Sequence, residues 1–241
     1  MKKKIPILAI IAILVFSCTT FAADKSIYVL TKINFKGKSY SVSYNKNGLV
    51  TEINMGSTKY KYYYDKNNLI REIVDMGNIK IYTDYTYGSN GQWQSSKMTS
   101  NYGGGITTKY TYNSKRLITK AVMQDTNGRT ENRSYNYNKK GYPTKMTHKG
   151  KDLSYTIKRS FDKKGILTKV VKTIIKGNAS NSTETIKNKY DRRGLLSSTE
   201  SSIDGKISYS YKNIKAKESL LDQIKEQQWW ITNFSLLYSI Y

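Results

Sequence analysis

Side chains able to carry acid–base or metal chemistry are scarce in this sequence of 241 residues. It holds one histidine, His148, and one cysteine, Cys18. His148 lies in Thr147-His148-Lys149-Gly150, a pattern typical of a turn, where a lone histidine is more often a solvated residue than a catalytic base. A single cysteine and a single histidine exclude a disulfide scaffold and a multi-cysteine zinc site. We therefore expect neither a metal site nor another cofactor.

The acidic residues are also poorly placed for catalysis. Asp65, Asp162 and Asp191 each begin a polar turn, where bonding to their own backbone explains them. Acid–base catalysis needs groups within reach of one substrate, which a spaced row of turn aspartates does not provide. A calcium site is the alternative, although calcium requires six to eight oxygens together. Phosphate-binding loops, nucleophile elbows and HExxH motifs are missing too, so we expect no enzyme.

Positive charge is the strongest chemical signal. Lys and Arg number 41 against 17 Asp and Glu, which gives a formal net charge of +24. Basic pairs lie in the predicted turns, and these are the candidate ligand contacts: Lys139, Lys140, Lys163, Lys164, Arg192 and Arg193. If these turns line one edge of a sheet, they form a basic ridge that attracts polyanions. The alternative is that the lysines only keep a sheet soluble and its edges unpaired.

These turns belong to an internal repeat that runs from about residue 27 to residue 211. Each unit is an aromatic strand end, a polar turn and an apolar strand, as in Tyr44-Asn45-Lys46-Asn47-Gly48-Leu49-Val50. The residues that anchor the units are Tyr44, Tyr64, Tyr87, Tyr112, Tyr137, Phe161, Tyr190 and Tyr211. Aromatics alternate before the turn and aliphatic or β-branched residues follow it, and both patterns predict strands. Glycine at the fourth turn position tolerates a positive φ, whereas Arg116 fits that position poorly and predicts a different turn there.

A second set of turns, such as Asn127-Gly128 and Asp204-Gly205, separates consecutive units and favours hairpins. The predicted fold is therefore all-β, an antiparallel meander in an open or half-wound sheet. We expect the anchor aromatics to form a ladder on one face, which offsets the shortage of aliphatic residues. The opposite face should be polar and in contact with water. The two sheet edges would be unprotected, and the oligomeric state stays open.

The units resemble the YD repeats of the Rhs family, in which Tyr-Asp is followed by two residues, Gly and an aliphatic residue. Tyr190-Asp191-Arg192-Arg193-Gly194-Leu195 and Phe161-Asp162-Lys163-Lys164-Gly165 are close matches, and Tyr137-Asn138 has Asn for Asp. The resemblance covers most of residues 24–211. It implies a wound β-sheet and an extracellular location. Two features depart from the family: about eight units are far fewer than a closed shell needs, and no Asp-Pro segment or toxin domain is present.

The two ends of the chain differ from the repeat. Residues 1–23 have a lysine-rich start, an apolar stretch and small residues near Ala22, which predict a cleaved signal peptide. Lipidation at Cys18 is the alternative, because Val15-Phe16-Ser17-Cys18 resembles a bacterial lipobox. Residues 212–241 are interpreted as a capping segment, a short helix followed by an apolar strand. An interfacial segment that meets a membrane or a partner is the other interpretation of this Trp- and Tyr-rich end.

These features predict an exported cell-surface or extracellular binding or structural protein that contacts anionic wall polymers or carbohydrate. Removal of residues 1–23 takes away three lysines and no acid, so the charge falls from +24 to +21 and polyanion binding stays favourable. An accessory or remnant fragment of an Rhs-type toxin system is the alternative. We expect no specific nucleic-acid partner, and peripheral membrane contact stays open.

Overall fold

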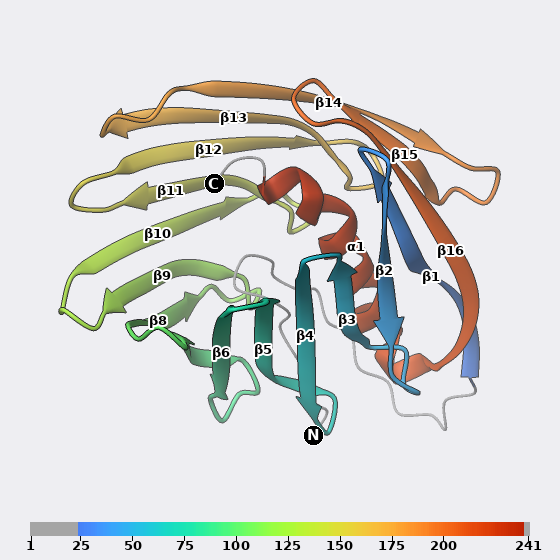
Figure 1. The fold of residues 1–241 in the computed structure, drawn as a ribbon, viewed down its shortest axis with the longest axis horizontal. Helices are drawn as coiled ribbons and strands as arrows, with labels where there is room; N and C mark the ends of the chain where they lie inside the picture. Colours follow the sequence, from blue (N-terminus) through green and yellow to red (C-terminus); the bar gives the residue numbers. More distant parts are fainter. Residues whose placement is uncertain (1–23, 239–241) are drawn as a thin grey trace.

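The computed structural model describes residues 24–238, and in this part of the chain sixteen antiparallel strands form one closed barrel (Figure 1). Each strand pairs with its neighbours in the sequence, and β1 pairs with β16 to close the ring. The strands are β1 (Asp24–Phe35), β2 (Lys38–Tyr44), β3 (Val50–Met55), β4 (Thr58–Asp65), β5 (Asn68–Met76), β6 (Ile79–Tyr87), β7 (Trp93–Ser100), β8 (Gly105–Tyr112), β9 (Ile118–Asp125), β10 (Thr130–Tyr137), β11 (Pro143–Lys149), β12 (Ser154–Phe161), β13 (Leu167–Lys176), β14 (Ser182–Tyr190), β15 (Leu196–Ser201) and β16 (Gly205–Lys217). A 3-10 turn, η1 (Glu218–Leu220), and a helix, α1 (Leu221–Tyr238), follow. The predicted signal peptide and Cys18 lie outside the described residues.

Alternation along the strands sorts the side chains between the lumen and the outer wall. On β4, Tyr60 and Tyr62 are buried in the lumen, whereas Tyr63 between two such positions is exposed. Period-two alternation places successive side chains on opposite faces, so the aromatic residues that recur before each turn all point inward. The apolar core therefore lies inside the barrel.

A bulge interrupts strand pairing at the same place in every unit. In each hairpin the register shifts next to the anchor aromatic, which then lies opposite the first buried residue after the turn. We call these the strand-start residues: Leu30, Val50, Leu69, Trp93, Ile118, Pro143, Leu167 and Leu196. Because a bulge bends a strand and increases its twist, eight equivalent bulges curl the sheet uniformly.

Five of the anchor aromatics join consecutive units through their hydroxyl groups. The Tyr64 hydroxyl donates to the carbonyl of Val50 at 2.7 Å, and the Tyr137 hydroxyl donates to the carbonyl of Ile118 at 2.7 Å. The same bond joins Tyr44 to Leu30, Tyr87 to Leu69 and Tyr112 to Trp93. Pairing with the next hairpin begins two residues beyond each strand-start residue, so the tyrosine satisfies a carbonyl that the strand ladder leaves unpaired. The expected ladder relied on contacts between anchor rings, whereas these five units are joined by tyrosine-to-backbone bonds in the lumen.

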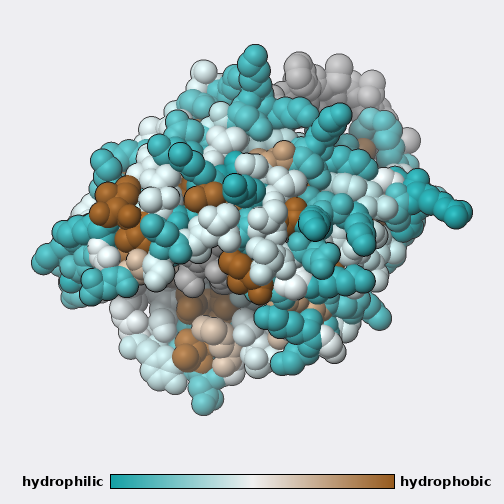
Figure 2. Space-filling model, turned by 90° about the horizontal axis from the view of Figure 1, so that it is seen from above, coloured by the Kyte–Doolittle hydropathy of each residue, from teal (hydrophilic) through white to brown (hydrophobic). Residues whose placement is uncertain are grey.

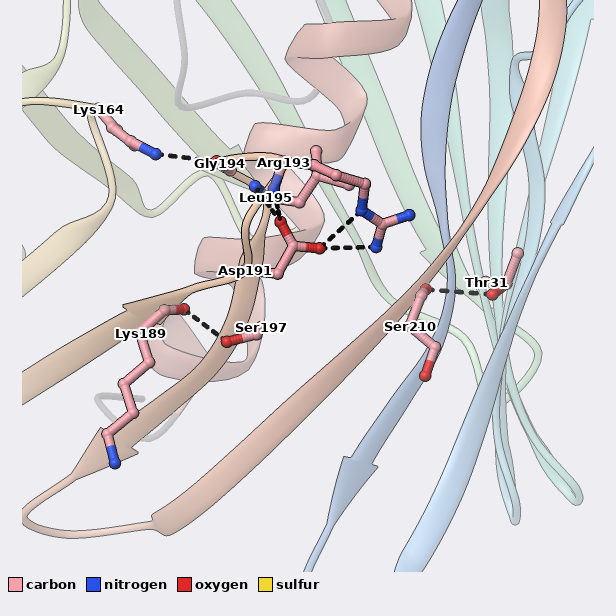
Figure 3. A network of polar contacts seen from close by, with 9 residues as sticks. All are labelled: Thr31, Lys164, Lys189, Asp191, Arg193, Gly194, Leu195, Ser197 and Ser210. Carbon is pink, nitrogen blue, oxygen red and sulfur yellow. Dashed lines mark hydrogen bonds and ion pairs between the residues drawn. The ribbon is translucent and has the colours of Figure 1, made fainter.

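The barrel closes because the two ends of the chain together make the eighth unit. Tyr211 on β16 lies opposite Leu30 on β1, with the same register shift as in the other units. The Thr31 hydroxyl donates to the carbonyl of Ser210 at 3.1 Å across this joint. Figure 3 shows the equivalent bond inside a hairpin, from the Ser197 hydroxyl to the carbonyl of Lys189 at 3.0 Å. The first strand therefore supplies the half that the last copy lacks.

The expected open or half-wound repeat sheet is wrong, and so is the winding that the Rhs resemblance implied. Eight hairpins were judged too few for a closed shell, but closure needs only that the last strand finds the first in register. Closure also removes both sheet edges, so the unprotected edges that were expected do not exist in the described barrel.

Helix α1 lies within the barrel, as Figure 1 shows, rather than on an open sheet. Ile224 is fully buried against Val29 and Leu49, and Ile231 joins the main core. The predicted strand after the helix is wrong, because the helix continues to Tyr238. The lumen surrounds the segment and offers no strand edge with which it could pair. Within residues 24–238, no helix has the length and apolar character needed to cross a membrane.

Candidate functional site

The hairpin turns divide between two rims, because successive turns of an antiparallel meander lie at opposite ends of the strands. The Asx rim carries the turns at residues 45–49, 66–67, 88–92, 113–117, 138–142, 162–166 and 191–195. The open rim carries the turns at residues 36–37, 56–57, 77–78, 101–104, 126–129, 150–153, 177–181 and 202–204. Helix α1 contacts the Asx rim, where its Gln223 side chain donates to the carbonyl of Asn67 at 3.0 Å.

The turn acids are occupied by the turns themselves. One carboxylate oxygen of Asp191 accepts the N–H groups of Arg193 at 2.9 Å and Leu195 at 3.0 Å (Figure 3). Asp162 accepts two turn N–H groups in the same way, and its other oxygen accepts the Tyr190 hydroxyl. Asp65 instead ends β4 beside a two-residue turn. No group of three potential metal-binding side chains occurs among the described residues.

The six predicted ligand contacts all lie exposed on the Asx rim. The side chains of two of them, Lys140 and Lys164, reach the neighbouring turn, and that of a third, Arg193, reaches β1. The Lys140 amine donates to the carbonyl of Lys163 at 3.2 Å, and the Lys164 amine donates to the carbonyl of Gly194 at 2.9 Å (Figure 3). Arg193 bonds Asp191 at 2.6 Å and lies over the ring of Tyr28, 4.7 Å from its centre. Lys139, Lys163 and Arg192 share the rim, and their side chains take no part in these turn-to-turn bonds. The basic turns therefore lie side by side along one edge, and their role in ligand binding stays a prediction.

The expectation of a different turn at Arg116 is wrong. Arg116 has a φ of +65° and occupies the place of the turn glycine, with the same backbone bonds as its neighbours: Asn113 N–H to the Leu117 carbonyl and Arg116 N–H to the Asn113 carbonyl, both 2.9 Å. Its side chain donates to the carbonyl of Asn90 at 2.7 Å on the adjacent turn. That bond and the Asx bonds of Asn113 hold a non-glycine residue in a conformation that costs energy.

Helix α1 binds two neighbouring repeat units through two consecutive glutamines. The Gln227 side chain accepts the Val50 N–H at 2.9 Å and donates to the Tyr64 hydroxyl at 2.8 Å. Gln228 does the same with the N–H of Leu30, at 2.6 Å, and the hydroxyl of Tyr44, at 2.9 Å. Sequence reasoning missed both glutamines, because their partners are defined only after the barrel has closed. Burial raises the pKa of Tyr44 and Tyr64 well above the usual range, so both hydroxyls stay protonated.

Opposite these glutamines, Trp229 anchors the helix to the far wall of the lumen. Its ring stacks on Tyr142 with centroids 5.9 Å apart, and its indole N–H donates to the carbonyl of Gly165. The helix therefore spans from the first hairpins to the turn between β12 and β13.

Deeper in the lumen lie ionisable side chains that the turn-based interpretation did not place there. Glu72 is buried and accepts the Tyr85 hydroxyl at 3.2 Å, and burial raises its pKa to about 7. His148 was expected in a solvated turn, which is wrong: it lies on β11 with its side chain 6% exposed. The only hint in the sequence is its alternation with Met146, which also points inward.

The outer wall has a different character. Outward positions along the strands are mainly Ser, Thr, Lys and Asn, as on β2, where Ser39, Ser41 and Ser43 alternate with inward residues. Figure 2 shows this hydrophilic surface on one face of the molecule, with hydrophobic residues confined to separate patches. The inside of the barrel is therefore mainly apolar, and its outer surface is mainly polar.

Comparison with solved structures supports the barrel architecture. A porin-like protein from Bacteroides uniformis superposes with a TM-score of 0.51 at 11% identity, over 80% of this chain and 98% of that one. A porin-like protein from Bacteroides vulgatus gives a TM-score of 0.53 at 11% identity, over 76% of this chain and 99% of that one. At this identity the likeness shows the fold alone. No protein-family model and no curated protein sequence matches the chain.

Proposed function

We propose that this protein is an exported, cell-surface or extracellular binding protein that contacts anionic wall polymers or glycans through its Asx rim. The observation that carries the proposal is the alignment of basic turns from three consecutive units along one edge, with Lys140 and Lys164 each reaching the next turn. Fixed spacing between like charges suits a polymer that carries regularly spaced anionic groups.

The residue composition of the outer wall favours a barrel that is surrounded by water. A barrel wall in contact with lipid carries an apolar band between aromatic girdles, whereas this wall carries Ser, Thr and Lys. Export itself rests on the order of lysines, apolar residues and small residues in the first 23 positions.

The test compares two triple variants with the same loss of charge. The rim variant replaces Lys139, Lys163 and Arg192 by Gln, because these three do not connect turns to one another. The wall variant replaces Lys97, Lys109 and Lys120, which are exposed on strands, by Gln. Binding of each to polygalacturonate, wall teichoic acid and neutral dextran is measured at about 0.05 M and about 0.5 M salt.

We expect binding to the two anionic polymers, no binding to dextran, and a loss of affinity at high salt. The rim variant should bind about fivefold more weakly than the unmodified protein at low salt, and the wall variant within about twofold of it. Equal losses in both variants would show attraction by net charge alone and would contradict the proposal, as would binding that salt does not weaken.

A further inference from the structure

The outer wall of β4, β5 and β6 carries an aromatic patch between the two rims. These three strands lie side by side in the barrel (Figure 1). Tyr63 on β4 lies directly opposite Arg71 on β5, which lies directly opposite Asp84 on β6. Tyr82, two residues before Asp84 on β6, lies opposite Ile73 on β5. We call these five residues the wall patch.

The side chains of the wall patch point into solvent. Tyr62, next to Tyr63 on the same strand, is buried in the lumen, so alternation turns Tyr63 outward, where it is 44% exposed. Arg71 is exposed, and its Nε–H donates to Asp84. That bond is the main cause that raises the pKa of Arg71, and Tyr63 and Tyr82 raise it further, so both tyrosine hydroxyls lie near the guanidinium group. A bonded pair of opposite charges therefore lies between two tyrosines.

The charges around the wall patch nearly balance, unlike those of the whole chain. Asp84 holds Arg71, and a carboxylate oxygen of Asp75 lies 3.6 Å from the amine of Lys61. The outward side chains of β3–β7 include five bases and four acids, namely Lys59, Lys61, Arg71, Lys80, Lys97, Glu52, Asp65, Asp75 and Asp84. A charged ligand has to compete with one member of a pair, whereas a hydroxyl can accept from the guanidinium group and donate to the carboxylate. This favours a neutral ligand that is rich in hydroxyl groups.

The dimensions of the wall patch favour a chain of sugars over a protein. A stable protein interface buries about 800 Å² on each partner. Tyr63, Ile73 and Tyr82 supply only a fraction of that area, because none of them is more than half exposed. The two tyrosines are two strands and two residues apart, which separates them by about 12 Å. This is longer than one sugar ring, so a chain of sugars can contact both.

We propose that the wall patch binds a neutral, β-linked glycan chain that lies flat across β4–β6. In a β-1,4-linked chain of glucose or N-acetylglucosamine, the ring substituents point outward in the ring plane, and both ring faces carry only C–H groups. These faces pack on the tyrosine rings, which offer a large apolar surface, while the hydroxyls bond to Arg71 and Asp84. Dextran lacks such a continuous flat face, because its α-1,6 links let the rings turn relative to one another. The site lies on the wall and does not rest on the function proposed for the Asx rim.

Binding of cellotetraose, chitotetraose and isomaltotetraose to the intact protein is measured by isothermal titration calorimetry at about 0.05 M and about 0.5 M salt. We expect one or both β-1,4-linked tetrasaccharides to bind, and isomaltotetraose to bind at least about tenfold more weakly. Salt should change the affinity by less than about twofold, because the ligand carries no charge. Tighter binding of chitotetraose would identify an N-acetylated amino-sugar chain as the source, and tighter binding of cellotetraose a plain glucan.

Tyr63→Ala and Tyr82→Ala should each weaken that binding by about fivefold or more, since the chain contacts both rings. Tyr102→Ala is the matched control, because this ring is 71% exposed in a turn at the open rim and lies outside the wall patch. It should leave the affinity within about twofold. Arg71→Gln keeps both rings of the patch and should weaken binding by about threefold or more, through loss of donors to the sugar hydroxyls.

The inference is overturned if neither β-1,4-linked chain binds, if isomaltotetraose binds as well as they do, or if the Tyr63 and Tyr102 variants behave alike. It is also overturned if analytical ultracentrifugation shows a dimer that Y63A abolishes, because the patch would then join two copies of the chain. The rim triple variant should bind the tetrasaccharides normally, and Y63A should bind polygalacturonate normally. Failure of either proposal is therefore distinguishable from failure of the other.

Discussion

The two ends of the barrel are built from the same hairpins but are held in different ways. At the Asx rim, side-chain oxygens hold the turn N–H groups, tyrosine hydroxyls hold the strand-start carbonyls, and glutamines of α1 hold two strand-start N–H groups. At the open rim, side-chain oxygens also hold turn N–H groups, as where Asp125 accepts those of Asn127 and Arg129. The tyrosine and glutamine bonds to strand-start residues belong to the Asx rim, whereas hydrophobic tips such as Tyr102 and Ile203 are exposed at the open rim.

This difference separates the parts of the molecule that set the strand register from the parts that only join strands. A bulge beside each anchor aromatic determines which residue lies opposite which, and all eight of these bulges are at the Asx rim. One further register shift, between Ser154 and Tyr155, lies at the open-rim end of β12. The open rim carries less of that information. We therefore expect the effects of mutation on stability to be larger at the Asx rim.

Loss of the Gln227 amide should give the largest effect. Gln227→Ala leaves the buried Val50 N–H without a partner, at a cost of about 1–3 kcal/mol, and removes the bond that the Tyr64 hydroxyl accepts, although this hydroxyl still donates to the Val50 carbonyl. We expect the free energy of unfolding to fall by about 2–4 kcal/mol, measured by urea denaturation.

Gln223→Ala serves as the control, because Gln223 lies on the same helix and donates only to a turn carbonyl. It should cost about 1 kcal/mol or less. Equal effects of the two substitutions would mean that the helix is held by its apolar face alone and that the glutamines do not distinguish the Asx rim.

Glu72 tests whether the middle of the lumen is dry. Below about pH 4.5 the carboxyl is protonated in both the folded and the unfolded chain. Between pH 4.5 and about 7 the unfolded chain releases its proton first, so the native barrel loses up to about 3 kcal/mol of stability, and this loss persists at higher pH. Glu72→Gln should remove this dependence and stabilise the protein by about 2–3 kcal/mol at about pH 8, but not at about pH 4.

Unfolding of the Glu72 variant at both pH values is the measurement, with Glu200→Gln as a control on the exposed outer wall. The control should change stability by less than about 0.5 kcal/mol at either pH. A Glu72 variant whose stability parallels that of the unmodified protein at both pH values would show that solvent reaches the middle of the lumen.

The smallest expected effect concerns backbone strain in one turn. Arg116→Gly relieves a positive φ, for a gain of about 1 kcal/mol, but gives up the exposed bond to Asn90 and adds flexibility to the unfolded chain. We expect a net stabilisation of about 0.5 kcal/mol, seen as a small rise in the thermal midpoint. At the open rim Gly56→Ala, at a φ of +79°, should destabilise by about 1 kcal/mol. Destabilisation by R116G would show that the turn-to-turn bond outweighs the strain.

Local features of the fold were predictable from the sequence because they depend on neighbouring residues. The strand and turn positions, the Asx bonds of residues such as Asp191, and the inward orientation of Tyr60 and Tyr62 all follow from period-two alternation and turn chemistry. The basic turns could also be placed along one edge, since turns of one kind share one end of a meander. The lumen side chains were not predictable, because Arg133, His148 and Tyr155 come together through the register of three strands.

The repeat can be recognised from the residues alone, because each of its eight similar pieces has an anchor aromatic, a polar turn and a strand. The ring, the place of α1 inside it and the inward direction of the one histidine depend on contacts between residues far apart in the chain. Closure pairs Leu30 with Tyr211, two residues almost the whole described chain apart. The bend added by each bulge must accumulate over all the strands before those ends can meet, and no local pattern in the chain records that sum.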